Sequence, residues 1–404
     1  MRGRRWGFLL LLVLLLPASL QAAPAGAPIT RDHYGVLFTA WVRAGDPLAT
    51  VRIRLTQNPS AVRWMRLSAP AAKYTAIKGS GSITREGDWV IWRPAGAKPW
   101  LQYVVNLESK RESGRFDGVV TPDFAIFRGD DLVPPVHLDM ADNTQSESKL
   151  ALNLPYGWRA VTPFPAYKSG RLQVQNPQRL FDRPTGWFAL GKLGVRRERI
   201  GETRLTIAAP TGQGVHRMDM LAFFRWTLPT MQRIFPSFPP RLVVVSAGDP
   251  MWRGALSGPD SLFVHADRPL ISENGTSTFL HELVHVAMRA RSRPDSDWIV
   301  EGLAEYYSLE VLHRAGALDD ARVEKAHAAL ALWGKDAPIL ETPHATGPVT
   351  AKAVGVLRQM DRDIRQASGG KRSLDDVARA LAAEDSAITR ARFDALVSSA
   401  KKGH

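Results

Sequence analysis

Short runs in which apolar and polar residues alternate fill the first third of the chain. Between residues 34 and 128 they include YGVLFTAWV, ATVRIRLTQ and WLQYVVNL, which are rich in β-branched residues and tryptophan. Glycine, proline, aspartate and asparagine separate these runs, and TREGDWVIW has the form of a hairpin. A period of two predicts strands with one buried face. We therefore expect a β-sandwich-like domain over residues 23–150, closed by the polar stretch 128–148.

The region that follows mixes strand and helix patterns. LALNLPYGWRAV, WFALGKLGVRRERI, TRLTIAAP, RLVVVSAG and DSLFVHAD predict strands, and HRMDMLAFFRWTLPTMQRIF predicts an amphipathic helix that Pro229 interrupts late. From residue 276 the apolar spacing becomes helical. Helices are expected at 276–290, 297–314, 319–332, 350–366, 373–383 and 386–399. The chain is thus predicted to be α+β, with a mixed β/α lobe at 151–295 and a helical lobe at 296–404.

The first 22 residues have the pattern of a secretory signal peptide. Arg2, Arg4 and Arg5 precede the apolar run 8–16, and small residues follow Pro17. An uncleaved anchor is the alternative interpretation. With cleavage, we expect a periplasmic or secreted protein that has no stable membrane insertion.

Composition narrows the chemistry that the chain can carry. It has 404 residues, a formal net charge of +14 and no cysteine. Disulfides, thiolate ligands and a cysteine nucleophile are therefore excluded. The basic residues are spread along the chain without a nucleic-acid motif, so we expect no nucleic-acid partner. Weak contact with anionic envelope polymers is compatible with the charge, although solubility explains it more simply.

One predicted helix carries the residues of a metal site. His281 and His285 in TFLHELVH are four apart and so share a helix face, which suits two imidazoles on one zinc ion. Glu282 can act as general base for a zinc-activated water. In WIVEGLAEYY, Glu301 is a candidate third ligand and Glu305 can fix the tautomer of a ligating histidine. The plain alternative is a pair of buried histidines beside a surface helix.

At these residues the sequence resembles the glutamate-zincin (gluzincin) metallopeptidases. HELVH and WIVEGLAEYY match the two helix motifs of that group, and the order of parts is similar to that of the glycyl and alanyl aminopeptidase families. The resemblance implies a thermolysin-like catalytic domain after the β domain. It also implies one zinc per chain, bound by His281, His285 and Glu301. Glu282 would be the general base, and Glu305 would accept a hydrogen bond from a ligating histidine. No PDZ domain is expected after the last predicted helix.

The sequence departs from these families where a substrate strand is expected. GALSG stands where the alanyl group has a G-A-M-E-N strand, so a serine replaces the glutamate that holds a free amine. A peptide could still pair with this strand, but the serine supplies no charge for an ammonium group. The candidate substrate-binding residues are Gly254, Ala255, Leu256 and Ser257.

A second departure concerns the donor to the oxyanion. Thr350 falls at the place of the family's tyrosine, and no tyrosine follows Tyr307 in the chain. His344, in ETPHATGP, is the candidate replacement, and a surface loop histidine is the alternative.

These observations predict an exported zinc metallopeptidase that hydrolyses peptides, with exo- or endo-action left open. One alternative is a zinc-fold binding or scaffolding protein with little or no turnover. The other is a zinc amidase that acts on cell-envelope material.

Overall fold

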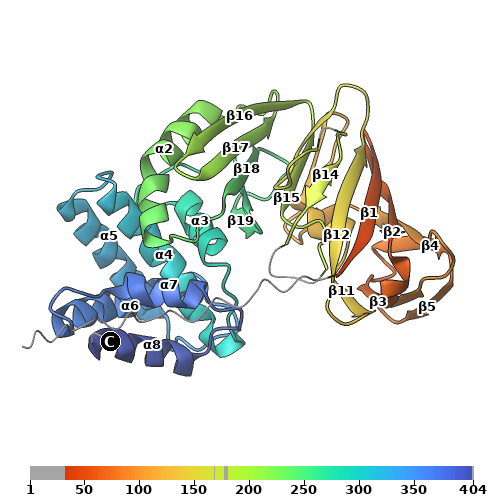
Figure 1. The fold of residues 1–404 in the computed structure, drawn as a ribbon. Helices are drawn as coiled ribbons and strands as arrows, with labels where there is room; N and C mark the ends of the chain where they lie inside the picture. The colour runs from red at the N-terminus through yellow and green to blue at the C-terminus, as the bar shows by residue number, and fades with distance from the viewer. Residues whose placement is uncertain (1–31, 168, 177–180, 403–404) are drawn as a thin grey trace, which may run out of the picture.

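The computed structural model describes residues 32–402 except 168 and 177–180. The predicted signal peptide lies outside these residues. Within them, none of the helices has the length and apolar character needed to cross a bilayer. Helices and strands are both extensive, so the prediction of an α+β chain is confirmed. Figure 1 shows the β-rich half and the helical half at opposite ends of the molecule.

The N-terminal half is built from three sheets around one apolar core. The first has the order β14-β12-β1-β2-β7-β4 and the second β11-β3-β6-β5. Their strands are β1 (Asp32–Arg43), β2 (Asp46–Gln57), β3 (Val62–Ser68), β4 (Tyr74–Gly79), β5 (Ser82–Glu86), β6 (Trp89–Arg93), β7 (Trp100–Asn106), β11 (Val136–Met140), β12 (Thr144–Asn153) and β14 (Leu172–Val174). Short helical turns lie at η1 (Pro59–Ala61) and α1 (Gly129–Leu132). Alternate residues of β2, β7 and β12 are buried, as the period of two predicts.

The third sheet continues the β-rich half beyond residue 150. Its order is β13-β15-β10-β9-β8, from β8 (Ser109–Lys110), β9 (Phe116–Val120), β10 (Phe124–Arg128), β13 (Arg159–Val161) and β15 (Trp187–Gly191). The expected domain boundary at 150 falls inside β12: β14 pairs with β12 and β15 pairs with β10, while β13 joins the same sheet through β15. The change of architecture follows Gly191, because pairing between distant strands carries the β-rich half to that point.

A mixed sheet then forms the centre of the molecule. Its order is β16-β17-β18-β20-β19, from β16 (Leu193–Ile200), β17 (Thr203–Pro210), β18 (Arg241–Ala247), β19 (Ala255–Gly258) and β20 (Ser261–His265). One face, including Val244 and Val264, packs on α2 (Arg217–Ile234) and α3 (Thr278–Met288). The other face, including Val245 and Phe263, packs on the sheet that contains β10 and β15. Both faces are covered, which fixes β19 beside α3.

Helix α2 differs from its prediction in one respect. It continues through Pro229 to Ile234 instead of breaking there. Proline removes one backbone donor near the end of the helix, while Leu228 and Met231 on either side are fully buried in the core. Packing of that face outweighs the lost hydrogen bond.

The C-terminal part is a set of packed helices. They are α4 (Asp297–Arg314), α5 (Asp320–Trp333), α6 (Pro348–Ala367), α7 (Leu374–Ala382) and α8 (Arg390–Lys402), with short turns η2 (Pro294–Ser296) and η3 (Gly334–Asp336). Helix α4 lies between α3 and α6 and is buried on most sides. It is anchored by Tyr307 and Arg314, which both bond to the Asp375 carboxylate of α7. This network holds the helix that carries Glu301 firmly in place.

Candidate metal centre

Helix α3 presents two histidines side by side. It begins after Ser277, whose hydroxyl accepts the backbone N–H of Leu280, and it is buried along its apolar faces. His281 and His285 are one turn apart on the remaining face. Their Nε2 atoms lie 3.2 Å from each other. The spacing of four therefore brings two ring nitrogens together, as expected for a helix.

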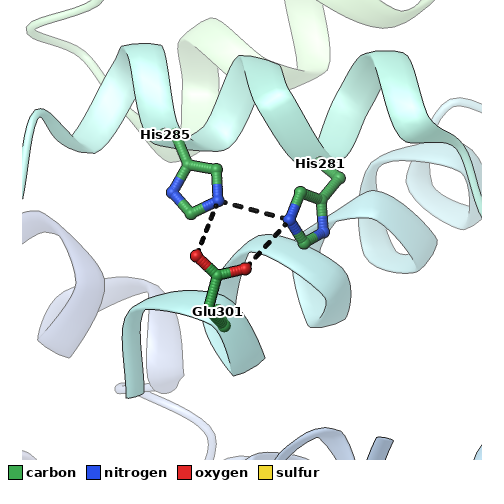
Figure 2. A group of neighbouring side chains, drawn as sticks. All are labelled: His281, His285 and Glu301. Carbon is green, nitrogen blue, oxygen red and sulfur yellow. Dashed lines mark hydrogen bonds and ion pairs between the residues drawn. The ribbon is translucent and has the colours of Figure 1, made fainter. Parts of the chain in front are cut away.

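Glu301 on α4 completes a triangle with these histidines. Its Oε2 lies 3.3 Å from His281 Nε2 and its Oε1 lies 3.4 Å from His285 Nε2. Figure 2 shows the carboxylate facing both rings. A tetrahedral ion with ligand bonds of about 2.05 Å separates its ligand atoms by roughly 3.3 Å. The nearest separations, 3.2, 3.3 and 3.4 Å, are close to this value, with the two carboxylate distances ending on different oxygens of Glu301, so the three side chains converge on one point. Nitrogen and carboxylate oxygen are also the donors that zinc prefers.

The three candidate ligands are shielded but reachable. The side chains of His281, His285 and Glu301 keep 18%, 16% and 29% of their surface exposed. Burial alone would lower the pKa of His281, but hydrogen bonds with Glu301 and Glu305 outweigh it and raise that pKa to about 10. Burial likewise opposes ionisation of Glu301, yet the two histidines hold the pKa of its carboxyl below the usual range. The cluster is built to hold positive charge, and a bound cation would displace the histidine proton.

Two more carboxylates stand around the triangle. Glu305 Oε2 lies 2.9 Å from Nδ1 of His281, so it fixes which ring nitrogen faces the triangle. Glu282 is half-buried beside His281, and its carboxylate has no hydrogen bond or ion pair to any described residue. An unengaged carboxylate next to a candidate metal site is available to exchange protons.

The strand GALSG lies at the edge of the central sheet. Among the described residues β19 pairs with β20 alone, and α3 packs against both strands. The N–H of His265 donates to the Gly254 carbonyl, so in this antiparallel pair the backbone groups of Ala255 and Ser257 face away from β20. Ala255 packs in the core shared with α3, which puts the Ser257 side chain on the α3 face as well. The edge that faces outward is therefore next to the helix with the histidines.

Residues of the β-rich half hold this edge strand. The Trp187 indole N–H donates to the Leu256 carbonyl at 2.8 Å, and the Arg128 guanidinium donates to the Ser257 carbonyl at 3.4 Å. A Cβ at Gly254 would lie 2.1 Å from the Trp252 indole, so a larger residue there would require this ring to move. The sequence did not point to Arg128 or Trp187, because both contacts join segments that are more than sixty residues apart.

The loop before β19 is also held by the β-rich half. Arg111 stacks on Trp252, with its guanidinium carbon 3.8 Å from the ring centroid. Phe116 in β9 exchanges backbone hydrogen bonds with this loop through Pro250 and Trp252. Trp252 thus packs against the hairpin of β8 and β9.

His344 lies in the loop between η3 and α6, and its side chain is exposed. The next residue is held from two sides: the Ala345 N–H donates to Asp297 at 2.9 Å, and the Thr350 hydroxyl donates to the Ala345 carbonyl at 3.1 Å. Asp297 is one turn before Glu301 on α4, so the loop is tied to the helix that carries the third candidate ligand. Thr350 is engaged with this loop. The oxyanion role of His344 stays a prediction.

No protein-family model matches this sequence, and no curated protein matches it either. Among solved structures, the fold is similar to the crystal structure of an aminopeptidase N family protein from Idiomarina loihiensis. The TM-score is 0.63 and the sequences are 15% identical, with 86% of this chain and 70% of that chain covered. At this level of identity the likeness concerns the fold alone: this chain has an aminopeptidase-like fold.

Proposed function

We propose that this protein is a zinc metallopeptidase. The observation that carries the proposal is the triangle of His281, His285 and Glu301, whose nearest donor atoms lie 3.2 to 3.4 Å apart, close to the spacing of ligands around one zinc ion. The aminopeptidase-like fold adds support at a coarser level. When bound there, zinc supplies Lewis acidity that lowers the pKa of water and polarises a carbonyl.

The residues around the triangle have distinct roles in this proposal. Glu282 takes a proton from the attacking water and delivers it to the leaving amine nitrogen, because its carboxylate is not engaged elsewhere in the described chain. Glu305 accepts from Nδ1 of His281 and keeps Nε2 directed at the ion. The third ligand, Glu301, is held by the buried helix α4.

A peptide substrate would lie in extended form along β19. The backbone groups of Ala255 face away from the sheet and can pair with a peptide strand, whereas the Ser257 carbonyl already accepts from Arg128. Ser257 offers no charge for an N-terminal ammonium group. We therefore expect peptides with a blocked N-terminus to be cleaved at least as well as free ones.

A binding protein with little turnover is the second candidate, and one observation favours it. The Thr350 hydroxyl at the place of the expected oxyanion donor is engaged with Ala345. In the peptidase proposal His344 takes the donor role from the loop tied to Asp297. Loss of one oxyanion donor typically reduces turnover by on the order of a hundredfold or more, so His344→Ala separates the two candidates.

The decisive experiment combines metal analysis of purified protein with a peptide-library digest. The library should contain each peptide with a free and with an acetylated N-terminus. We expect about one zinc per chain and cleavage that disappears in Glu282→Gln. Bound zinc without cleavage would favour the binding-protein candidate. A protein that takes up no zinc would reject both candidate functions.

A further inference from the structure

A shallow groove lies on the β-rich half, on the outer face of the sheet that contains β1, β2 and β7. Its volume is about 590 Å³. The groove is lined by an indole, two guanidinium groups, two amides and a hydroxyl, from Trp41, Arg43, Thr50, Arg52, Gln102 and Asn153. These side chains can donate hydrogen bonds, and none is a carboxylate.

Strand register places these side chains in rows across the sheet. Trp41 is paired with Asn153 on one side and with Thr50 on the other, and Arg52 is paired with Gln102. The intervening residues point into the core, as Val51 with no exposed surface shows. The polar rows are thus held on a rigid, outward-facing sheet surface.

Arg52 is the centre of this surface. Its Nε and one Nη donate to the Gln102 side-chain oxygen at 3.0 and 2.7 Å. Its guanidinium carbon lies 5.6 Å from the Trp41 ring centroid and 5.2 Å from that of Trp100. No carboxylate of the described chain pairs with it. A guanidinium held by an amide and two aromatic rings keeps its charge uncompensated and its remaining N–H groups pre-oriented.

We propose that this groove binds an acidic glycan. Arg52 would pair with a sugar carboxylate, and the Trp41 indole supplies an apolar wall for a sugar ring. Thr50, Gln102 and Asn153 match the hydroxyl groups that a glycan presents along its length. This inference does not depend on the proposed peptidase function, because the groove shares no residue with the metal centre.

The surface does not favour an acidic peptide. Peptides bind to sheets mainly through backbone pairing at a free edge. The groove residues come from β12, β1, β2 and β7, and all four strands lie inside the sheet, between β14 and β4. Around Arg52, which is paired with a neighbouring strand on both sides, only side chains are offered to a ligand, and they are suited to carboxylate and hydroxyl groups together.

The test is a calorimetric titration of the full mature chain with a tetramer of galacturonic acid at fixed ionic strength. We expect saturable binding that Arg52→Gln weakens by on the order of tenfold or more, because a charge-assisted hydrogen bond is lost. Trp41→Leu should weaken binding as well. Arg54→Gln is the matched control: it removes the same charge from the next row of the same strand and face, and should change affinity by less than about twofold.

Other outcomes would overturn the inference. An Arg54→Gln effect as large as that of Arg52→Gln would reduce the binding to general attraction between charges. Equal affinity for tetraglutamate would show that the groove recognises acidic peptides. Equal affinity for uncharged cellotetraose would show that Arg52 does not recognise a sugar carboxylate. No binding to the wild-type protein would reject the site. If Arg52→Gln lowers the melting temperature strongly, Gln102→Leu keeps the charge but releases the guanidinium, and it should weaken binding less.

Discussion

The candidate metal centre and the outer edge of β19, which is the proposed substrate edge, lie side by side but are built differently. The candidate ligands come from two helices that follow each other in the chain, and the spacing within each helix brings their donor atoms to 3.2–3.4 Å. The edge at β19 is only four residues long and is held by Trp187 and Arg128 from a different sheet. The comparison teaches that substitutions in α3 and α4 should affect metal binding and turnover. Substitutions of Trp187 or Arg128, which hold β19, should instead affect substrate binding.

The largest effect is expected from Glu301→Ala. It removes one corner of the triangle and leaves the two histidines without their shared carboxylate. The variant should lose tightly bound zinc and with it all measurable hydrolysis, as shown by elemental analysis and peptide digestion. Added zinc should raise the melting temperature of the wild type and leave that of the variant unchanged. A variant that retains zinc at wild-type affinity would remove Glu301 from the ligand set.

Glu282→Gln should separate chemistry from metal binding. The amide cannot accept a proton, so turnover should fall by on the order of a hundredfold to ten-thousandfold. Zinc content and melting temperature should stay at wild-type values, since Glu282 bonds to no described residue. Activity near the wild-type level would show that another group is the base.

Glu305→Gln tests the support behind His281. The hydrogen bond of 2.9 Å to Nδ1 orients the ring, and its replacement by an amide should weaken zinc affinity by roughly 10- to 100-fold. The matched control is Glu310→Gln on the same helix, where the carboxylate pairs with Arg314 instead. Competition with a metal chelator measures both. Equal loss of affinity in the control would indicate a general effect on α4.

The smallest effect is expected at the substrate edge. Trp187→Phe keeps a buried aromatic ring but removes the donor to the Leu256 carbonyl. We expect KM to rise a few-fold, with kcat and zinc content unchanged, because a neutral hydrogen bond contributes about 1 kcal/mol. Trp92→Phe is the matched control, since this buried indole donates to the Ser80 carbonyl in the β-rich half. Both variants should lose similar thermal stability; a similar KM change in both would break the link between Trp187 and the edge.

Much of the helical half could be predicted from the sequence, because helices depend on local spacing and end signals. The predicted helix over 297–314 has the same bounds as α4, and the other predicted helices all occur with shifted ends. The triangle of His281, His285 and Glu301 also depends mostly on local sequence. The spacing of four in α3 orients both histidines, and the motif on the next helix identifies Glu301.

Only the tertiary structure decided how the strands combine. β1 pairs in parallel with β12, more than a hundred residues later, and β15 joins β10 across the expected boundary at 150. The same is true of the contacts of Trp187 and Arg128 with β19, and of the two bonds that engage Ala345. Strand pairing and side-chain contacts between distant segments leave no periodic signal, because any strand with one apolar face can pair with many others. The sequence by itself therefore determined the helices and the candidate metal ligands within them, while the sheet order and the environment of the proposed substrate edge depended on the packed fold.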